Sequence, residues 1–469
     1  MTAPVLDPSL HRAPLRTVVR VSLCAAAALA LPSMPARAQQ ASRGTRDTTL
    51  ANGLEVKVLE DHSAPLATVL VTVRTGAFTQ QPDEAGLSHV YEHMLFRTYK
   101  LDPSKFDEDA ANLKAVYNGV TNEDNVSYYM LLPSENTDKA IAQLAYLVTR
   151  VHFRDKDLDE ELPVILDELA RDAADPDGRL ARKEDRVLWG DSWYLKDPGG
   201  DSTSLKHVTL TRLEEYSKRY YVPNNAALFV TGDVDAEDVF HAAADHFGGW
   251  RREDDPFAGD TLPPMTPLSA SQVVVVTSEA PEATVRIEFQ GPGLDRDPTA
   301  AEAMARLVDI LNDPGSRFRR DMVGNGPFRE LECDFDKGLS SGTVVFEGTA
   351  DLARVTEAAR TLSDTLNDLT AYLAGGDSAS GRVKNLEDLD LALTLEDGAT
   401  LAPYLAKLWG RGEFLDLEHP YDSNQSKAAD VLGAARTYLE GRPRVIGVTV
   451  PGPLAEEVRT KIQAGEGQR

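Results

Sequence analysis

The chain has 469 residues, and its 49 lysines and arginines against 75 aspartates and glutamates give a formal net charge of −26. This acidity argues against broad binding of nucleic-acid backbones, which needs a basic face to displace counterions. No apolar run reaches the roughly 18–20 residues of a membrane-spanning helix. The length predicts two or more domains. Two cysteines cannot build a thiolate zinc site, so a bound metal would need His, Asp or Glu ligands.

The first 38 residues have the layout of a secretory signal peptide. Three arginines precede the apolar stretch 21–31, and Ala36-Arg37-Ala38 follows as a cleavage site. We therefore expect residues 1–38 to be removed from an exported protein that is periplasmic or secreted. Removal would also take away Cys24 and leave Cys333 as the one thiol of a disulfide-free mature chain.

The mature chain shows one order of predicted elements twice. In the first half we expect strands at 54–59 and 67–74, a helix from about 83, a strand at 127–132, and helices at 137–150 and 236–247. The Pro-rich, polar stretch 254–271 is the expected linker. In the second half we expect strands at 272–277 and 283–290, a helix at 298–311, a strand at 342–348 and a helix at 350–369.

This repeated pattern predicts an α+β protein of two homologous domains. Each domain is expected to be a mixed or antiparallel sheet packed with helices. The predicted boundaries place the N-terminal domain at 39–260 and the C-terminal domain at 261–469.

The densest chemical signal is the segment His89-Val90-Tyr91-Glu92-His93. On a helix, His89 and His93 lie one turn apart on one face and can hold a cation between two imidazoles. Glu92 lies beside them, where its carboxylate can reach a metal-bound water. This order, H-x-x-E-H, is inverted relative to the H-E-x-x-H zinc peptidases. The other histidines of the mature chain are scattered and are expected to be structural or surface residues.

Two histidines leave a zinc site incomplete, and the third protein ligand of a catalytic site is often a glutamate. The acidic, helical stretch 157–172 is the best source of that ligand. Spacing alone leaves four candidates open: Glu160, Glu161, Asp167 and Glu168. Each of them can also be part of an ordinary solvated helix face.

The chain resembles the pitrilysin, insulinase and mitochondrial processing peptidase family of zinc metallopeptidases, in its short two-domain bacterial type. The resemblance is carried by Gly86 to Phe96, Asn118-Gly119-Val120-Thr121, Glu161 to Glu168, Tyr221 to Asn225 and Gly232-Asp233-Val234, and more weakly by Ser316-Arg317-Phe318 in the second half. It implies that His89, His93 and Glu168 bind Zn²⁺ and that Glu161 orients a ligating histidine. Pro163 departs from the family pattern and is expected to kink a helix that runs through it.

The resemblance also implies a function. A zinc metalloendopeptidase would hydrolyse a peptide bond with a zinc-bound water whose proton Glu92 takes. The substrate would be a peptide or an unfolded protein segment. It would add as a strand to the sheet edge formed by Asn118, Gly119, Val120 and Thr121.

A second subunit is part of this expectation. Active chains of the family often carry an Arg and a Tyr in the second half that hold the substrate backbone. The corresponding stretch 322–332 lacks the pair, with Arg329 nearby and no Tyr at the expected spacing. Either another residue serves or a partner supplies the pair, and we favour a partner, as a homo- or heterodimer with a second family subunit. The alternatives are a non-catalytic scaffolding relative within a peptidase-like complex and a zinc-dependent hydrolase of another substrate class.

Overall fold

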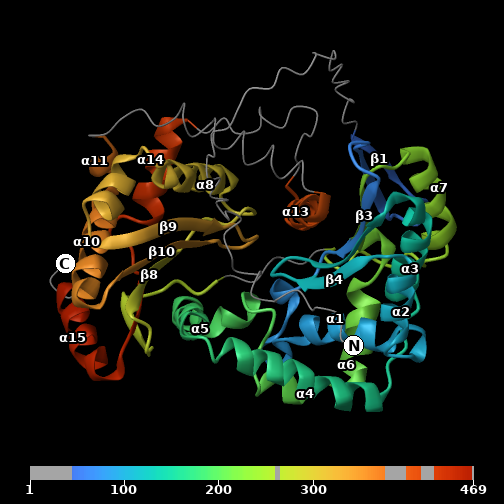
Figure 1. Cartoon of the computed structure of the whole chain (residues 1–469), viewed down its shortest axis with the longest axis horizontal. Helices are drawn as coiled ribbons and strands as arrows, with labels where there is room; N and C mark the ends of the chain where they lie inside the picture. The colour runs from blue at the N-terminus through green and yellow to red at the C-terminus, as the bar shows by residue number, and fades with distance from the viewer. Residues whose placement is uncertain (1–44, 259–264, 375–397, 414–426, 467–469) are drawn as a thin grey trace, which may run out of the picture. The chain divides into compact units, whose positions relative to one another are not determined.

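The computed structural model describes residues 45–258, 265–374, 398–413 and 427–466. These residues form two β-sheets, each packed with helices (Figure 1), which confirms the predicted α+β fold of two domains. The predicted signal peptide, 1–38, and part of the predicted linker lie outside the described residues, and the predicted domain boundaries stay a prediction. None of the described helices combines the length and the apolar character that crossing a membrane requires.

The first sheet has six strands in the order β1-β2-β6-β3-β5-β4, so that β4 is an edge strand. Its strands are β1 (Thr45–Thr49), β2 (Glu55–Glu60), β3 (Leu66–Val73), β4 (Val116–Thr121), β5 (Val126–Pro133) and β6 (Ala226–Gly232). β2 and β6 run parallel, and the other neighbours run antiparallel. The helices of this half are α1 (Leu87–Thr98), α2 (Lys105–Asn112), α3 (Thr137–Thr149), α4 (Asp155–Asp172), α5 (Pro176–Trp189), α6 (Leu210–Tyr220) and α7 (Ala236–Phe247).

The second sheet has five strands in the order β7-β11-β8-β10-β9. Its strands are β7 (Gln272–Thr277), β8 (Glu282–Gln290), β9 (Phe328–Asp336), β10 (Thr343–Asp351) and β11 (Val445–Val450). The helices of this half are α8 (Pro298–Asn312), α9 (Arg317–Arg319), α10 (Val355–Asn367), α11 (Leu369–Ala374), α13 (Gly398–Gly410), α14 (Ala428–Tyr438) and α15 (Ala455–Glu466). β7 and β11 are parallel and the rest antiparallel, which repeats the arrangement β2-β6-β3-β5-β4 of the first sheet.

Each sheet buries one face against helices of its own half. In the first half, alternate residues of β3 such as Val69 and Val71 pack on Met94 of α1 and Leu144 of α3. The alternation of inward side chains along these strands is the period-two pattern that the sequence shows. α1, which carries the H-x-x-E-H residues, is therefore anchored in the main core of the first half.

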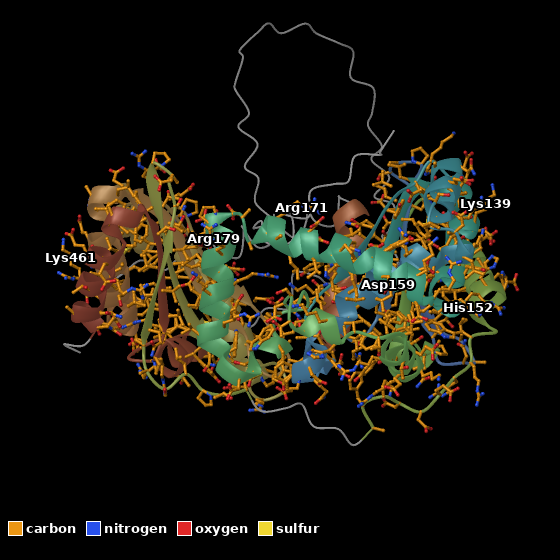
Figure 2. All side chains as sticks on the ribbon, turned by 90° about the horizontal axis from the view of Figure 1, so that it is seen from below. Lys139, His152, Asp159, Arg171, Arg179 and Lys461 are labelled. Carbon is orange, nitrogen blue, oxygen red and sulfur yellow. The ribbon has the colours of Figure 1, made fainter. Side chains whose placement is uncertain are left out.

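The opposite face of each sheet is covered by a helix from the other half. Leu405 of α13 belongs to a buried cluster with Leu70 and Phe229 of the first sheet. Trp189 of α5 belongs to a buried cluster with Val276 of the second sheet. Arg179 of α5, which is labelled in Figure 2, also donates to the backbone carbonyl of Thr277 at the end of β7, at 3.0 Å. The two halves thus exchange covering helices.

The first site helix starts later than predicted. We expected a helix from about Asp83, but residues 82–84 form a separate 3₁₀ turn and α1 begins at Leu87. The helix cannot extend backwards because Gly86 is left-handed, with φ of 90°. A Cβ at this glycine would lie 2.8 Å from the carbonyl oxygen of Gly199, so a larger residue would strain the turn. The helix expected at 350–369 likewise begins at Val355, because β10 continues to Asp351.

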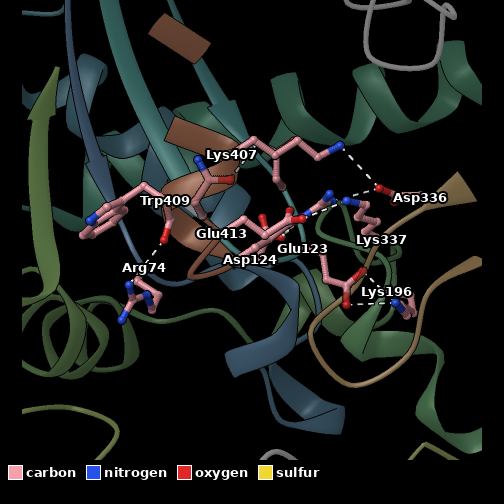
Figure 3. A network of polar contacts seen from close by, with 12 residues as sticks. Arg74, Glu123, Asp124, Lys196, Asp336, Lys337, Lys407, Trp409 and Glu413 are labelled. Atoms are coloured by element: carbon pink, nitrogen blue, oxygen red, sulfur yellow. Dashed lines mark hydrogen bonds and ion pairs between the residues drawn. The ribbon is translucent and has the colours of Figure 1, made fainter. Parts of the chain in front are cut away.

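A buried ionic network also joins the two halves (Figure 3). Arg411, which follows α13, donates to Asp124 at 2.5 Å and to Asp336 at 2.9 Å. Asp124 lies in the loop between β4 and β5, and Asp336 ends β9. The side chains of Arg411 and Asp124 are 7% and 1% exposed, so this pair is shielded from solvent screening. Removing Arg411 would take from the buried carboxylate of Asp124 the cation that compensates its charge, whereas Arg411 would keep Asp336 if Asp124 were removed.

Glu123 is a member of this network whose pKa lies near neutral pH. Lys196 donates to both of its carboxylate oxygens, at 2.8 and 2.9 Å, and to the carbonyl oxygen of Ser341. Burial raises the pKa of Glu123 to about 7, against the opposing effect of Lys196. A carboxyl group with a raised pKa binds its proton more tightly in the folded chain than in the unfolded chain.

Glu123→Gln is expected to change the pH dependence of stability. The stabilisation from the protonated carboxyl is fully present below the unfolded pKa of about 4.3 and is lost as the pH rises through the folded pKa. Between about pH 5 and about pH 8, the unfolding free energy of the wild type should fall by about 1–3 kcal/mol relative to that of the variant. Urea unfolding at both pH values measures this difference. The exposed Glu135→Gln is the control, and equal pH dependence of Glu123→Gln and wild type would contradict the expectation.

Candidate functional site

The candidate site forms where α1 and α4 lie in contact. α1 presents His89 and His93 one helical turn apart, with their Nε2 atoms 3.2 Å from one another. The two imidazole rings are nearly perpendicular, at 87°. Both nitrogens therefore point at a common position, as the i, i+4 spacing on a helix predicts.

α4 brings a carboxylate to the two histidines. Oε2 of Glu168 lies 3.5 Å from Nε2 of His93. One ligand atom from each of His89, His93 and Glu168 lies within 4.8 Å of the others. Of the other acidic candidates of α4, Glu160 pairs with Arg97 and Asp167 is exposed, whereas Glu161 contacts His93 at Nδ1 and not at Nε2. Among the residues that spacing left open, the structure thus places Glu168 at the imidazoles.

Glu161 contacts the outer side of the same histidine. Its Oε1 lies 3.0 Å from Nδ1 of His93, a distance at which the Nδ1–H donates to the carboxylate. Because Nδ1 faces Glu161, Nε2 is the ring nitrogen that faces Glu168 and His89. α4 is one helix from Asp155 to Asp172 with Pro163 inside it, so the proline does not separate Glu161 from the site.

The donor set fits a zinc ion. Two ligand nitrogens of a tetrahedral zinc site, each about 2.0–2.1 Å from the metal, lie roughly 3.3–3.4 Å from one another. The Nε2 atoms of His89 and His93 are 3.2 Å apart, close to that spacing. Two imidazoles and one carboxylate are also a known set of protein ligands for catalytic zinc.

The electrostatics of the group favour positive charge. Burial lowers the pKa of His93, but hydrogen bonds with Glu161 and Glu168 outweigh this and raise it to about 10. The hydrogen bond with His93 in turn lowers the pKa of Glu168. The surrounding carboxylates therefore stabilise a cation at this position, which is the condition for binding a divalent metal.

Glu92 lies beside the histidines with its side chain largely buried. The residue is 7% exposed, and this burial raises the pKa of its carboxyl, against the opposing effects of His93 and Thr121. The Oγ1 of Thr121 donates to Oε2 of Glu92 at 2.6 Å. A carboxylate with a raised pKa is a stronger proton acceptor than an exposed carboxylate.

The four residues predicted to bind substrate lie on β4. Asn118, Gly119, Val120 and Thr121 are the last four of the six residues of this edge strand, which contacts α1. The side-chain oxygen of Asn118 accepts the backbone N–H of Gly119 at 3.0 Å. Gly119 and Thr121 share one face of the strand, because side chains alternate along it.

Sequence reasoning missed Gln80, which holds the start of α1. Its Oε1 accepts from the backbone N–H of Gly86 at 2.7 Å and from the hydroxyl of Ser88 at 3.2 Å. Its amide nitrogen donates to the backbone carbonyl of Tyr194 at 2.8 Å. These bonds satisfy donors that a helix N-terminus leaves open. No local pattern marks Gln80, because its partners meet it through the fold.

The remaining histidines lie away from the site. Those in the described part of the chain are exposed: His62, His152, His207, His241 and His246. This confirms the prediction for them, whereas His419 lies outside the described residues. Cys333 is buried on β9, and burial raises the pKa of its thiol, so it is not a reactive nucleophile.

The stretch 322–332 offers no free cation to a substrate. Met322 and Phe328 are buried. Arg329 donates to Asp351 at 2.6 and 2.9 Å and pairs with Glu282 at 2.9 Å. Arg329 is thus held by neighbouring carboxylates of the second sheet.

Comparisons with known proteins identify two matching family models and several relatives. Residues 56–184 match the family model described as insulinase (peptidase family M16), and residues 207–373 match the model described as peptidase M16 inactive domain. A protein of Arabidopsis thaliana named "Probable mitochondrial-processing peptidase subunit beta, mitochondrial" is 25% identical over 272 residues, which cover 57% of this chain and 51% of that protein. An "Uncharacterized zinc protease" of Rickettsia felis is 28% identical over 199 residues, covering 41% of this chain and 47% of that protein.

The fold is also found among solved structures. The crystal structure of the periplasmic protease PqqL from Escherichia coli superposes with a TM-score of 0.74 at 19% identity, covering 90% of this chain and 50% of that chain. At this identity the likeness concerns the fold. The chain spans about half the length of the curated relatives it matches.

Glu168→Gln is expected to weaken metal binding, because it removes the anionic ligand. The loss should exceed the 10–100-fold that is typical for residues that only orient a ligand, whereas Glu161→Gln should fall within about that range. Zinc content after dialysis against a graded zinc buffer, measured by mass spectrometry, gives the affinities. Glu160→Gln on the same helix is the matched control. Wild-type affinity in Glu168→Gln would contradict this ligand set.

Proposed function

The chain belongs to the insulinase family of peptidases (M16), and from this premise we propose that it is an exported zinc metalloendopeptidase. The observation that carries the proposal is the convergence of His89, His93 and Glu168 with Glu92 alongside. A relative named a zinc protease supports the same chemistry. The residues needed to bind the metal and to move a proton are thus all provided by this chain.

His89, His93 and Glu168 would hold the zinc ion, and Glu161 would keep His93 in the tautomer that leaves Nε2 available. When bound, Zn²⁺ supplies a Lewis acid that polarises the scissile carbonyl and makes a water more acidic. Glu92 takes a proton from the attacking water and returns it to the leaving amine. Its burial suits this role, because it raises the pKa of the carboxyl and so makes the carboxylate a stronger base.

The substrate is proposed to bind as an added strand on β4. This strand ends the first sheet, so its outer edge is open to pairing with an extended peptide. The proposed contacts are made by Asn118, Gly119, Val120 and Thr121, which lie next to α1. A peptide or unfolded segment meets this requirement, because a folded substrate has few extended backbones available for pairing.

A second subunit is proposed to complete the substrate site. Support comes from Arg329, which is held by Asp351 and Glu282, and from the relative that is named a subunit of a processing peptidase. We propose a homo- or heterodimer in which a family subunit supplies the cationic and phenolic groups for the substrate backbone. Export to the periplasm or beyond is proposed from the N-terminal sequence and from the periplasmic relative of the same fold.

The alternative is a non-catalytic scaffolding subunit within a peptidase-like complex. The observation that favours the scaffolding function is the match of residues 207–373 to a model described as an inactive domain. A scaffold needs neither the metal ligands nor Glu92, however, and this chain carries all of them. Activity and zinc content therefore separate the two functions.

Glu92→Gln is expected to abolish peptide hydrolysis while zinc stays bound. The amide keeps the size of the side chain but cannot accept the proton, and a positioned general base contributes about 10²–10⁴-fold to the rate. Cleavage of a fluorogenic peptide library and zinc content, both against wild type and Glu160→Gln, test this. A variant that cleaves at the wild-type rate rules out the mechanism. A zinc-loaded wild type that cleaves nothing, alone or with a partner, supports the scaffold.

The proposed subunit predicts that the isolated chain is a weak peptidase. Its specific activity should be low where sedimentation shows a monomer. It should rise with concentration if a second copy completes the site, or on addition of a separate family subunit if the assembly is heteromeric. Full activity of the monomer would contradict the need for a partner and would leave the zinc chemistry in place.

A further inference from the structure

The strand that borders the candidate site lies against the proposed base at two positions. Gly119 and Thr121 are two residues apart on β4, so both turn towards the same side of the first sheet. Each of them lies against the carboxylate of Glu92 on α1. The base is thus enclosed by β4 as well as by its own helix.

Thr121 provides a directed donor to this carboxylate. Its Oγ1 donates to Oε2 of Glu92 at 2.6 Å, a short O–H···O distance typical of hydrogen bonds to an ionised acceptor. Threonine is stiff at χ1 because of its branched Cβ, so its hydroxyl has a defined direction on a strand. The hydroxyl has one proton to donate, and here that proton is used on Glu92.

Gly119 makes room for the second oxygen of the same carboxylate. A Cβ at this position would lie 2.3 Å from Oε1 and 2.7 Å from Cδ of Glu92. The absence of a Cβ at Gly119 therefore leaves the space that Oε1 occupies. With Oε2 bonded to Thr121, Oε1 is the oxygen available to receive a proton.

We propose that Thr121 is a positioning residue, whose hydroxyl fixes the carboxylate of Glu92 in the orientation for proton transfer. The proposal rests on the proposed function, in which Glu92 is the base. It assigns Thr121 a role distinct from substrate binding, because the side chain acts on Glu92 while the backbone of β4 faces the peptide. Gly119 contributes to the same arrangement, because it leaves room for the carboxylate of Glu92.

Two substitutions of Thr121 separate this role from simple packing, because the hydroxyl and the methyl group on its Cβ can be removed one at a time. Thr121→Val keeps the shape and loses the hydroxyl, whereas Thr121→Ser keeps the hydroxyl and loses the methyl group. Because general-base catalysis contributes about 10²–10⁴-fold, misplacing the base should lower kcat of Thr121→Val by about 10-fold or more with little change in KM. Thr121→Ser should retain most of the rate, and zinc content should be unchanged in both variants.

Thr349→Val is the matched control. Its hydroxyl also lies beside a glutamate, Oε1 of Glu330 at 3.4 Å, but on the second sheet and away from the site. This variant should keep the wild-type kcat. If Thr121→Val and Thr121→Ser lower kcat equally, or if Thr121→Val keeps the wild-type kcat, the positioning role is overturned while peptidase activity still supports the proposed function.

A double-mutant cycle on stability tests the contact without activity. In the metal-stripped full chain, Thr121→Val should lower the urea midpoint, because it removes the donor to a buried carboxylate. In the Glu92→Ala background the same substitution should leave the midpoint unchanged, since the acceptor is already absent. Additive effects in the two backgrounds would overturn the proposal even if the wild type proves to have no peptidase activity.

Discussion

The contact between α1 and α4 is the constraint on which the candidate site depends. Neither helix carries a complete set of candidate ligands, since α1 provides two imidazoles and the proposed base, and α4 provides Glu161 and Glu168. Metal sites require donors placed within about 0.5 Å of their ideal positions, so the packing of these helices must be rigid. Gln80 fixes the start of α1, and the core of the first sheet fixes its buried side.

The same contact gathers charges that would repel one another without a cation. Three glutamates, Glu92, Glu161 and Glu168, lie beside the two histidines. Burial lowers the pKa of His93, but these carboxylates raise it to about 10. Burial also raises the pKa of Glu92, because a charged carboxylate is poorly solvated there. Thr121 then matters beyond geometry, since it is a neutral donor that stabilises one carboxylate without adding a competing charge.

The parts of the molecule that local patterns control were predictable. The period-two strands and the i, i+4 histidines follow from neighbours in sequence, and the topology of the two sheets confirms the repeat. Glu168 was selected by resemblance alone, because spacing could not exclude Glu161. Two contacts had no signal at all. Thr121 meets Glu92 through the placement of β4 beside α1, and Gln80 meets Gly86 through a loop. The first contact joins segments that lie far apart in the sequence. The second depends on the conformation of residues 81–85, which no periodic pattern of residue types specifies.

Because each half covers a sheet of the other half with a helix, the two halves cannot simply be separated. A fragment that stops before α13 would keep the three candidate metal ligands and Glu92, yet it would leave the face of the first sheet around Leu70 and Phe229 in water. Bare sheet faces of this kind promote association. The sequence midpoint is therefore not a place where the protein can be cut into two independent parts. If the chain were divided there, the first piece would hold every candidate metal ligand, yet it would need the second piece to cover its sheet.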